Sequence, residues 1–416
     1  MNNDLTAKWI TVFWFLMGFS VILIVGSQIS WSSWYPPRSA IGLVIVIFIT
    51  YATSFLFSHR LVTYPIRNPI LLFVLLVSAN HIGAIVIPAV FRFYYSRSFI
   101  LVSLLITLIW ISIAYLVAAN EKSKKKVGLV QNKYSDELSL MPDYRWIEIS
   151  TVPSLHQLEY DIISADLHGD LTDEWKRFLA DASLSGIPVI DSAILYESLS
   201  GRISLSHLAN SSIDEVKTQY PTYPPIKRIF DLLFIIVLSP IIFLVMAIIA
   251  IAIRIEGSGP VIFVQERVGY RNQLFKMYKF RSMSDFSENH ETKFTGKDDQ
   301  RITNTGRILR KHRLDELPQL INVLNGKMSL IGPRPEQQDF VTEYSQTIAF
   351  YPYRHSVKPG ITGWAQVSQG YTSSEESTRK KLEHDFYYIK HVSPWLDLLI
   401  LIKTFNTILG GYGSRY

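Results

Sequence analysis

Cysteine is absent from this 416-residue chain, and charged residues are scarce. Without cysteine the chain can form no disulfide, no thiolate nucleophile and no cysteine-ligated metal site. Charged residues make up 18% of the sequence and hydrophobic residues 48%, and the mean hydropathy is +0.18. Charged residues usually form about a quarter of a soluble domain. The composition therefore predicts a membrane part joined to a soluble part, and the length allows two or three domains.

Acidic residues are outnumbered, with 35 Asp and Glu against 41 Lys and Arg. The resulting net charge of +6 favours anionic partners, namely phospholipid headgroups, nucleotide diphosphates or nucleic acid. Charge alone does not decide among these three classes.

Four apolar stretches fill the first 120 residues, at about 9–29, 39–58, 69–91 and 98–118. Each is close to the ~20 residues that a helix needs to cross a bilayer. No small-residue cleavage site follows the first stretch, so it is interpreted as a retained helix and not as a signal peptide. The pattern predicts a four-helix transmembrane domain over residues 1–126. A buried helical bundle in a soluble protein is the alternative.

Basic residues near the predicted helix ends are unequally divided between the two sides of this domain. One side has seven and the other has three: Lys8, Arg60, Arg67, Lys122, Lys124, Lys125 and Lys126 against Arg38, Arg92 and Arg97. Because basic loops tend to stay in the cytoplasm, the division predicts that the N-terminus and everything after Lys126 are cytoplasmic. The basic run at 121–126 would then lie against anionic lipid.

Residues 127–220 change to short β-like runs that alternate with helical patterns. Examples are the apolar runs at 146–149 and 187–190 and the helical spacing at 172–182. They predict a small cytosolic α/β module, to which no catalysis is assigned because it lacks a glycine-rich phosphate loop. A linker rich in Pro and Tyr at 220–225 marks the boundary of a third domain, residues 221–416.

An apolar run at 229–253 has the length of a fifth crossing helix, which would send the rest of the chain to the far side of the membrane. Three features oppose that interpretation. Ser239-Pro240 lies near the middle, where proline removes a backbone hydrogen bond and kinks a helix. Asp231 interrupts the apolar entry, and both flanks are basic. A re-entrant helix over 228–254, broken at Ser239 and Pro240, would satisfy all three.

Two adjacent acids, Asp315 and Glu316, follow eight residues of which five are basic. Apolar side chains recur with helical spacing from Leu317 to Leu324, so an amphipathic helix is expected over 316–325 with both acids at its N-terminus. One acid could attack a phosphorus while the other binds Mg²⁺, which commonly takes one or two carboxylates plus substrate phosphates. The alternative is a charge cluster that only stabilises the helix.

Cationic side chains recur on both sides of these acids in the sequence. Lys279 and Arg281 lie in an alternating segment that would line an anionic site, unless it is only a solvated basic surface. Arg334 stands between two prolines in a rigid turn that suits bidentate contact with phosphate, with a purely structural turn as the alternative. Arg354 begins a further segment, 354–367, that supplies more cations.

The segment from about residue 227 to the C-terminus resembles the bacterial sugar transferase family, the monotopic phosphoglycosyl transferases. Four motifs carry the resemblance, and together they are specific: Tyr-Lys-Phe-Arg-Ser-Met at 278–283, Leu-Asp-Glu-Leu-Pro-Gln-Leu-Ile-Asn-Val-Leu at 314–324, Ser-Leu-Ile-Gly-Pro-Arg-Pro at 329–335 and Lys-Pro-Gly-Ile-Thr-Gly-Trp-Ala-Gln-Val at 358–367. With the preceding helices and module, the chain is similar to the long subgroup that primes polysaccharide repeat units. The fold class implied is membrane α plus α/β, with a mainly helical catalytic domain.

The resemblance implies a two-step transfer at the bacterial cytoplasmic (inner) membrane. Asp315 would attack the sugar-linked phosphorus of a UDP-hexose, release UMP and hold the phosphosugar as an acyl phosphate, which undecaprenyl phosphate would then take. Glu316 would bind Mg²⁺, and the phosphates would be held by Lys279, Arg281, Arg310, Arg334 and Arg354. Family similarity further implies contact with membrane lipid, a homodimer and no nucleic-acid partner.

The segment 368–375 departs from the family, many of whose members carry Asn-Gly and an arginine there, so the sugar is not predicted. Neither the polysaccharide nor the role of the α/β module is predicted from the sequence. Two other functions remain open: a glycosyltransferase that moves only the sugar and releases UDP, and a non-enzymatic membrane scaffold of polysaccharide export. Asp315→Asn separates catalysis from scaffolding, because a scaffold tolerates that change.

Overall fold

The computed structural model describes all of the chain except residues 1, 67–68, 93, 154–158, 211–215, 218–220, 285–300, 370–374 and 411–416. Arg67, the first linker residue Tyr220 and most of the divergent segment 368–375 therefore lie outside the described residues. The chain divides into two compact units, Met1–Leu199 and Ser200–Tyr416. Among the described residues, five helices are long and apolar enough to cross a membrane, four of them in the first unit and one in the second.

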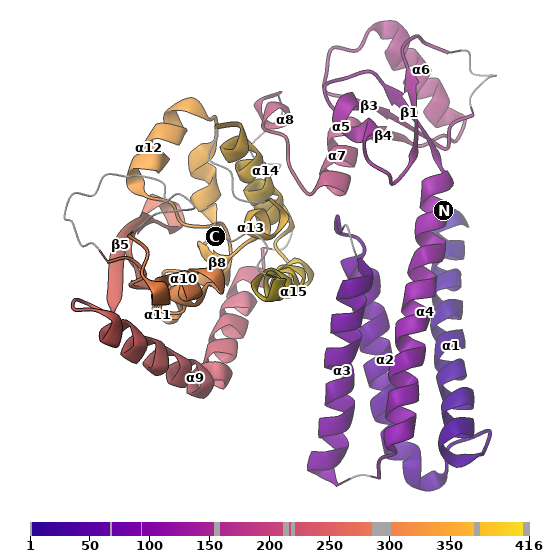
Figure 1. The fold of residues 1–416 in the computed structure, drawn as a ribbon. Coiled ribbons are helices and arrows are strands. Elements are labelled where there is room, and N and C mark those ends of the chain that lie inside the picture. The colour runs from indigo at the N-terminus through magenta and orange to yellow at the C-terminus, as the bar shows by residue number, and fades with distance from the viewer. Residues whose placement is uncertain are drawn as a thin grey trace. The chain divides into compact units, whose positions relative to one another are not determined.

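The first unit begins with four long helices (Figure 1). They are α1 (Asn2–Trp31), α2 (Ile41–Leu61), α3 (Pro69–Phe91) and α4 (Arg97–Lys124), with a short 3-10 turn at Arg38–Ala40 before α2. Their shared core includes Leu43, Ile47, Tyr51 and Phe99, all fully buried. Many outward-facing apolar side chains are exposed, which suits lipid as the surrounding solvent. Helices α2 and α3 agree closely with the stretches predicted from hydropathy, whereas α1 begins seven residues earlier than predicted and α4 ends six residues later.

The N-terminal end of α1 and the C-terminal end of α4 lie at the same end of this bundle (Figure 1). Lys122 and Lys124 are in the last turn of α4, and β1 follows at once. Lys122 Nζ lies 2.9 Å from Asp143 Oδ1, which ties the helix end to the module after it. The basic side predicted from the sequence is thus the side on which the α/β module lies.

The module contains a four-stranded parallel sheet in the order β2-β1-β3-β4. Its strands are β1 (Lys126–Val130), β2 (Arg145–Ile149), β3 (Ile162–Ala165) and β4 (Val189–Asp191), and its helices are α5 (Ser135–Ser139), α6 (Asp173–Leu184) and α7 (Ser192–Ser200). One apolar cluster joins Leu129 to Tyr196 of α7, and another joins Ile163 to Phe178 of α6. Helices therefore cover the sheet through two separate cores, as is usual for parallel sheets.

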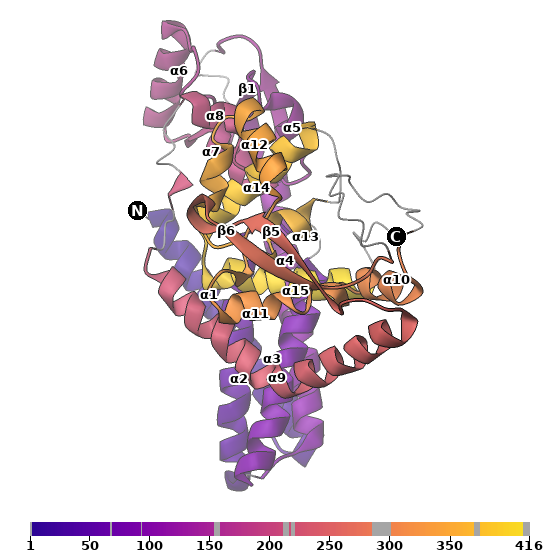
Figure 2. The same cartoon turned by 90° about the vertical axis from the view of Figure 1, so that its left-hand side faces the viewer.

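The second unit is built around two small sheets with helices packed on them (Figure 2). Strands β5 (Ile262–Val268) and β6 (Leu274–Phe280) form an antiparallel hairpin, while β7 (Ser329–Ile331) and β8 (Gly360–Thr362) pair in parallel. The helices are α8 (Leu205–Asn210), α9 (Tyr223–Glu256), α10 (Asn304–Lys311), α11 (Gln319–Leu324), α12 (Gln338–Thr347), α13 (Trp364–Ser368), α14 (Glu375–His391) and α15 (Pro394–Gly410), with 3-10 turns η4 (Tyr270–Asn272), η5 (Leu314–Glu316) and η6 (Tyr351–Ser356).

Helix α9 carries the Ser-Pro pair inside one continuous helix, and its ribbon changes direction near the middle (Figures 1 and 2). Pro240 has no N–H to donate to the carbonyl of Ile236, four residues earlier. The Ser239 hydroxyl donates to that carbonyl instead, at 2.8 Å. The expected helix–break–helix is therefore a bent helix in which the serine satisfies the carbonyl that the proline leaves open.

Both arms of α9 pack on the same small set of elements. Ile235 on the first arm shares a core with Met277 of β6, while Ile253 on the second arm shares one with Phe280 of the same strand. In a straight helix Ile235 and Ile253 would be about 27 Å apart, whereas Met277 and Phe280 are only three strand residues, about 10 Å, apart. The bend is what allows the two contacts to coexist.

Polar side chains fasten both ends of α9 to this unit. At the first end, Lys227 Nζ donates to Asp397 Oδ2 of α15 at 2.6 Å, and Asp231 Oδ2 accepts from the Ser329 hydroxyl at 2.7 Å. At the second end, the Arg281 guanidinium donates to the carbonyls of Ile253, Gly257 and Ser258. Arg281, predicted to bind substrate, is 7% exposed and lies in the C-terminal cap of α9.

Candidate active site

Asp315 and Glu316 lie in the 3-10 turn η5, which precedes α11. The sequence predicted a helix that begins at Glu316, but α11 begins at Gln319. Pro318 cannot donate an N–H to the Leu314 carbonyl, and the turn is closed instead by the tighter bond from Leu317 N at 3.3 Å. Both acids are consequently presented on a tight turn just before the helix.

The two carboxylates have different partners. Glu316 is 8% exposed, and its Oε1 accepts from Arg334 Nη2 at 2.8 Å. Asp315 is half-buried, and within the described part of the chain its carboxylate takes part in no hydrogen bond or ion pair. One acid is therefore fixed by an arginine, while the other is available to a reacting group.

These surroundings shift the pKa values of the two carboxyl groups in opposite directions. Burial raises the pKa of Asp315, as does the neighbouring Glu316 charge, and the cations Lys279 and Arg310 oppose the rise only in part. For Glu316, burial alone would raise the pKa, but Arg334 and Lys279 outweigh burial and bring the pKa to about 2. Glu316 thus stays ionised, whereas Asp315 is the more basic carboxylate, as a nucleophile should be.

Lys279 faces the acids from strand β6. Alternate residues of that strand, Phe275 and Met277, are buried in the core, and Lys279 continues the same face. Burial lowers the pKa of Lys279 to about 8, helped by the nearby Arg334 and opposed by Glu316 and Asp315. The ammonium group is therefore held in an enclosed site beside both carboxylates.

Arg310 and Arg334 complete the cationic surroundings of Asp315. Arg310, in the last turn of α10, donates from Nε to the Ser282 hydroxyl at 2.7 Å. Arg334 stands in the turn between β7 and α12, where Gly332 lies so close to strand β8 that a Cβ would meet the Lys358 carbonyl at 2.4 Å. Backbone contact between the strands fixes this turn, and Arg334 extends from it to Glu316.

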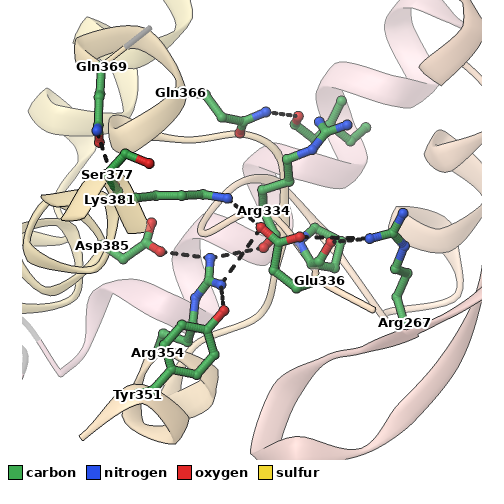
Figure 3. Close-up of polar contacts among 12 residues, drawn as sticks. Arg267, Arg334, Glu336, Tyr351, Arg354, Gln366, Gln369, Ser377, Lys381 and Asp385 are labelled. Carbon is green, nitrogen blue, oxygen red and sulfur yellow. Dashed lines mark hydrogen bonds and ion pairs between the residues drawn. The ribbon is translucent and has the colours of Figure 1, made fainter. Parts of the chain in front are cut away.

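Arg354, predicted to contact substrate, is 2% exposed and already engaged by protein groups (Figure 3). Its Nη1 donates to the Tyr351 hydroxyl at 2.7 Å, and its Nη2 lies 2.7 Å from Asp385 Oδ2 and donates to the Arg334 carbonyl at 3.1 Å. The structure brings together Lys279, Arg310 and Arg334 around the two acids, and it places Arg354 behind the Arg334 turn.

Sequence reasoning missed the acids and bases that surround Arg354. They are Arg267, Glu336, Lys381 and Asp385. Glu336 directly follows the Pro-Arg-Pro turn, and that position is the one local signal that could have singled it out. The other three lie on elements far apart in the sequence, so only the fold shows that they lie together around Arg354.

The residues at this site fit a divalent cation only in combination with a phosphate substrate. Among the described residues there is no group of three or more His, Cys, Asp and Glu side chains arranged to hold a metal. Mg²⁺ needs just one or two carboxylates when phosphates supply further oxygens. Arg334 donates to Glu316 Oε1, and Oε2 is the remaining carboxylate oxygen that could act as a ligand atom. The donor set therefore suits Mg²⁺ brought together with a nucleotide sugar.

Comparison with known proteins finds relatives along almost the whole chain. Residues 222–411 match a family model described as bacterial sugar transferase. A UDP-N-acetylgalactosamine-undecaprenyl-phosphate N-acetylgalactosaminephosphotransferase of Aeromonas hydrophila is 40% identical over 371 residues, which are 88% of this chain and 86% of that protein. The similarity to it therefore includes the first unit as well as the second.

Other relatives match a smaller share of the chain. A UDP-glucose:undecaprenyl-phosphate glucose-1-phosphate transferase of Escherichia coli (strain K12) is 40% identical over 192 residues, 46% of this chain and 41% of that protein. An uncharacterised sugar transferase of Bacillus subtilis is also 40% identical over 190 residues, and the match covers 46% of this chain and 90% of that protein. Proteins with different sugars in their names thus share about half of this chain.

Proposed function

The chain belongs to the bacterial sugar transferase family, and from that premise we propose that it moves a hexose-1-phosphate from a UDP-sugar to undecaprenyl phosphate. The products are UMP and undecaprenyl-diphosphate-sugar, the first membrane step of a polysaccharide repeat unit. Relatives named for this type of transfer support the reaction class. The observation that carries the mechanism is the Asp315 carboxylate, which has no hydrogen bond or ion pair among the described residues and lies among cations next to Glu316.

The transfer is proposed to proceed in two displacements at phosphorus. In the first, an Asp315 oxygen bonds to the sugar-linked phosphorus, the P–O bond to the UMP phosphate breaks, and UMP leaves with that bonding electron pair. In the second, a phosphate oxygen of undecaprenyl phosphate bonds to the same phosphorus, and the acyl-phosphate bond returns its electron pair to Asp315. The carboxylate is regenerated, so one residue serves both halves.

The surrounding residues bind and orient the reacting phosphates. Lys279, Arg310 and Arg334 place positive charge where negative charge builds up on the bridging and non-bridging oxygens. Glu316 fixes the Arg334 guanidinium and would hold Mg²⁺ together with the pyrophosphate. Bound Mg²⁺ would offset charge on the departing UMP phosphate.

We further propose that α9 enters and leaves the same leaflet and that the second unit faces the cytoplasm. The bend near Ser239 and Pro240 and the attachment of both arms to β6 support re-entry over crossing. A crossing helix would carry its two ends to opposite faces of a ~30 Å hydrocarbon layer. Re-entry keeps the acids at the membrane surface, where a soluble UDP-sugar and a lipid phosphate can meet.

The test is nucleotide release by the purified full-length chain in nanodiscs with Mg²⁺, undecaprenyl phosphate and a panel of UDP-sugars. The panel contains UDP-N-acetylgalactosamine, UDP-N-acetylglucosamine, UDP-glucose and UDP-galactose. We expect UMP from one donor, and a loss of at least about a thousandfold in Asp315→Asn. Mass spectrometry of the enzyme quenched without acceptor should find a phosphosugar on the peptide that contains Asp315.

Each other result favours a different function. UDP in place of UMP would overturn the mechanism in favour of simple glycosyl transfer. No nucleotide from any donor, with folded protein, would favour the non-enzymatic scaffold. The donor that is used answers the question that the sequence leaves open, since the relatives' names include both N-acetylgalactosamine and glucose.

A further inference from the structure

A buried cluster of charged side chains lies behind the Arg334 turn (Figure 3). Glu336 is at its centre: its carboxylate forms an ion pair with Lys381 and lies 3.8 Å from Arg267 Nη1 and 3.9 Å from Arg354 Nη1. Burial alone would raise the pKa of Glu336, but Lys381 and Arg354 outweigh burial and bring the pKa to about 2. Glu336 is therefore ionised at neutral pH, and the proposed reaction uses none of the groups in the cluster.

The cluster supports a turn that has few hydrogen-bond donors of its own. Residues 333 and 335 are prolines, which have no N–H, so the backbone carbonyls are the points at which the turn can be held. Each of four successive carbonyls accepts from a different donor. The Pro333 carbonyl accepts from Gly360 N, that of Arg334 from Arg354, that of Pro335 from Arg267, and that of Glu336 from Val268 N.

The donor to Arg334 is itself held by an acid on another helix and by a hydroxyl of its own turn. Arg354 in η6 contacts Asp385 on α14 at 2.7 Å, and both side chains are 2% exposed. Its second arm donates to the Tyr351 hydroxyl at 2.7 Å. The planar guanidinium is thus fixed at both ends, and its position determines where the Arg334 backbone lies.

We propose that Arg354, fixed by Asp385 and Glu336, is a positioning residue that directs the Arg334 guanidinium to Glu316 and the substrate phosphates. The inference rests on the proposed function and assigns Arg354 a role at the same site without contact with substrate. Arg334 is held at its carbonyl by Arg354 and at its guanidinium by Glu316. Without the contact from Arg354, Arg334 is less ordered when its guanidinium contacts Glu316. Phosphate binding and transfer are therefore weaker.

The test is a double-mutant cycle with the full-length chain in nanodiscs, read as kcat/KM for UMP release. Arg354→Lys keeps the charge that Asp385 and Glu336 require but cannot donate to Tyr351 and Arg334 in one plane. We expect it to lower kcat/KM about tenfold in the wild-type background. In an Arg334→Gln background the guanidinium that Arg354 directs is missing. There Arg354→Lys should lower kcat/KM less than about twofold.

A matched control separates positioning from general structural damage. Arg281 is also a buried arginine that donates to backbone carbonyls, but its side-chain hydrogen bonds to described residues go to the end of α9 and not to the Arg334 turn. Losses from Arg281→Lys and Arg334→Gln should therefore multiply. For variants whose turnover is too slow to measure, the same double-mutant cycle is read from the dissociation constant for UDP with Mg²⁺, measured by calorimetry.

Each outcome bears on one of the two proposals. Equal losses from Arg354→Lys in both backgrounds, or no loss in the wild type, would show that Arg354 does not act through Arg334. No UMP from the wild type with any donor would instead reject the proposed function, and the UDP-binding cycle would still decide the positioning role. A strong coupling between Arg354→Lys and Arg334→Gln, with no coupling between Arg281→Lys and Arg334→Gln, supports the inference.

Discussion

Asp315 and Glu316 are adjacent, and the side chain that distinguishes them is Arg334. Of the two acids, Glu316 is the one that forms an ion pair with Arg334, so Glu316 is ionised and fixed, while Asp315 keeps a raised pKa. Position in the sequence could not have assigned these roles, because both acids follow the same basic segment. In the proposed mechanism, the partner of each carboxylate decides which acid would bind the cation and which would attack.

Replacement of Glu316 tests that division of roles. Glu316→Gln keeps the shape of the side chain but removes the charge that holds Arg334 and the proposed Mg²⁺. We expect UMP release to fall at least about hundredfold, with half-maximal rate at a higher Mg²⁺ concentration. The measurement is a Mg²⁺ titration of the initial rate for both proteins. Superimposable titrations would contradict a metal role for Glu316.

Lys279 should set the alkaline limit of the reaction. Because its pKa is lowered to about 8, the ammonium is charged below pH 8 and neutral above it. A neutral amine cannot hold phosphate by charge, so kcat/KM for the UDP-sugar should fall as the pH rises through about 8. Lys279→Arg stays charged and should move this limit upward, even if its activity is lower. An unchanged limit in the variant would assign it to another group.

At the scale of elements, strand β6 explains why two predicted cations have different positions. Lys279 and Arg281 are two residues apart, and strand alternation predicts that they share a face. The strand ends at Phe280, so Arg281 no longer follows the strand alternation. Its side chain extends instead to the C-terminal end of α9. Local pattern identified Lys279, Arg310 and Arg334 near the acids, but the end of a strand and the partners of Arg354 depend on tertiary contacts.

Helix α9 offers a direct test of its bend. Pro240→Ala restores an N–H inside the helix and removes a proline that costs about 3 kcal/mol there, so the helix should straighten. The second arm would then move from Phe280 and Leu309, and UMP release should fall at least about tenfold.

The matched control is Pro88→Ala, another proline inside a membrane helix, in the first unit. It should retain nearly normal activity, because Pro88 lies far from the acids in the sequence and in a different unit. Circular dichroism and size-exclusion profiles establish that both variants are folded. Full activity in Pro240→Ala would mean that the bend does not support the site.

At the scale of the whole molecule, the sequence predicted the positions of the apolar helices well because hydrophobic run length is a local property that the bilayer fixes. Helices α2 and α3 follow the expected ranges closely, and β2, β4 and α6 lie at the short runs predicted for the module. Length could not separate re-entry from crossing for α9, since 34 apolar-rich residues suffice for either. That choice depends on which elements both arms contact, and those contacts come mainly from β6, α10 and α11.

The absence of cysteine makes the topology directly measurable. Single cysteines can be placed at exposed positions outside the site: Trp34→Cys between α1 and α2, Leu184→Cys on the module, and Thr342→Cys on α12. With re-entry, an impermeant maleimide should label Trp34→Cys from outside the cell, and the other two only in inverted vesicles. The basic residues around Lys122 and Lys124 favour a module that faces the cytoplasm. If α9 crossed the membrane, Thr342→Cys would be labelled from the same side as Trp34→Cys, and the acids would be separated from a cytoplasmic UDP-sugar.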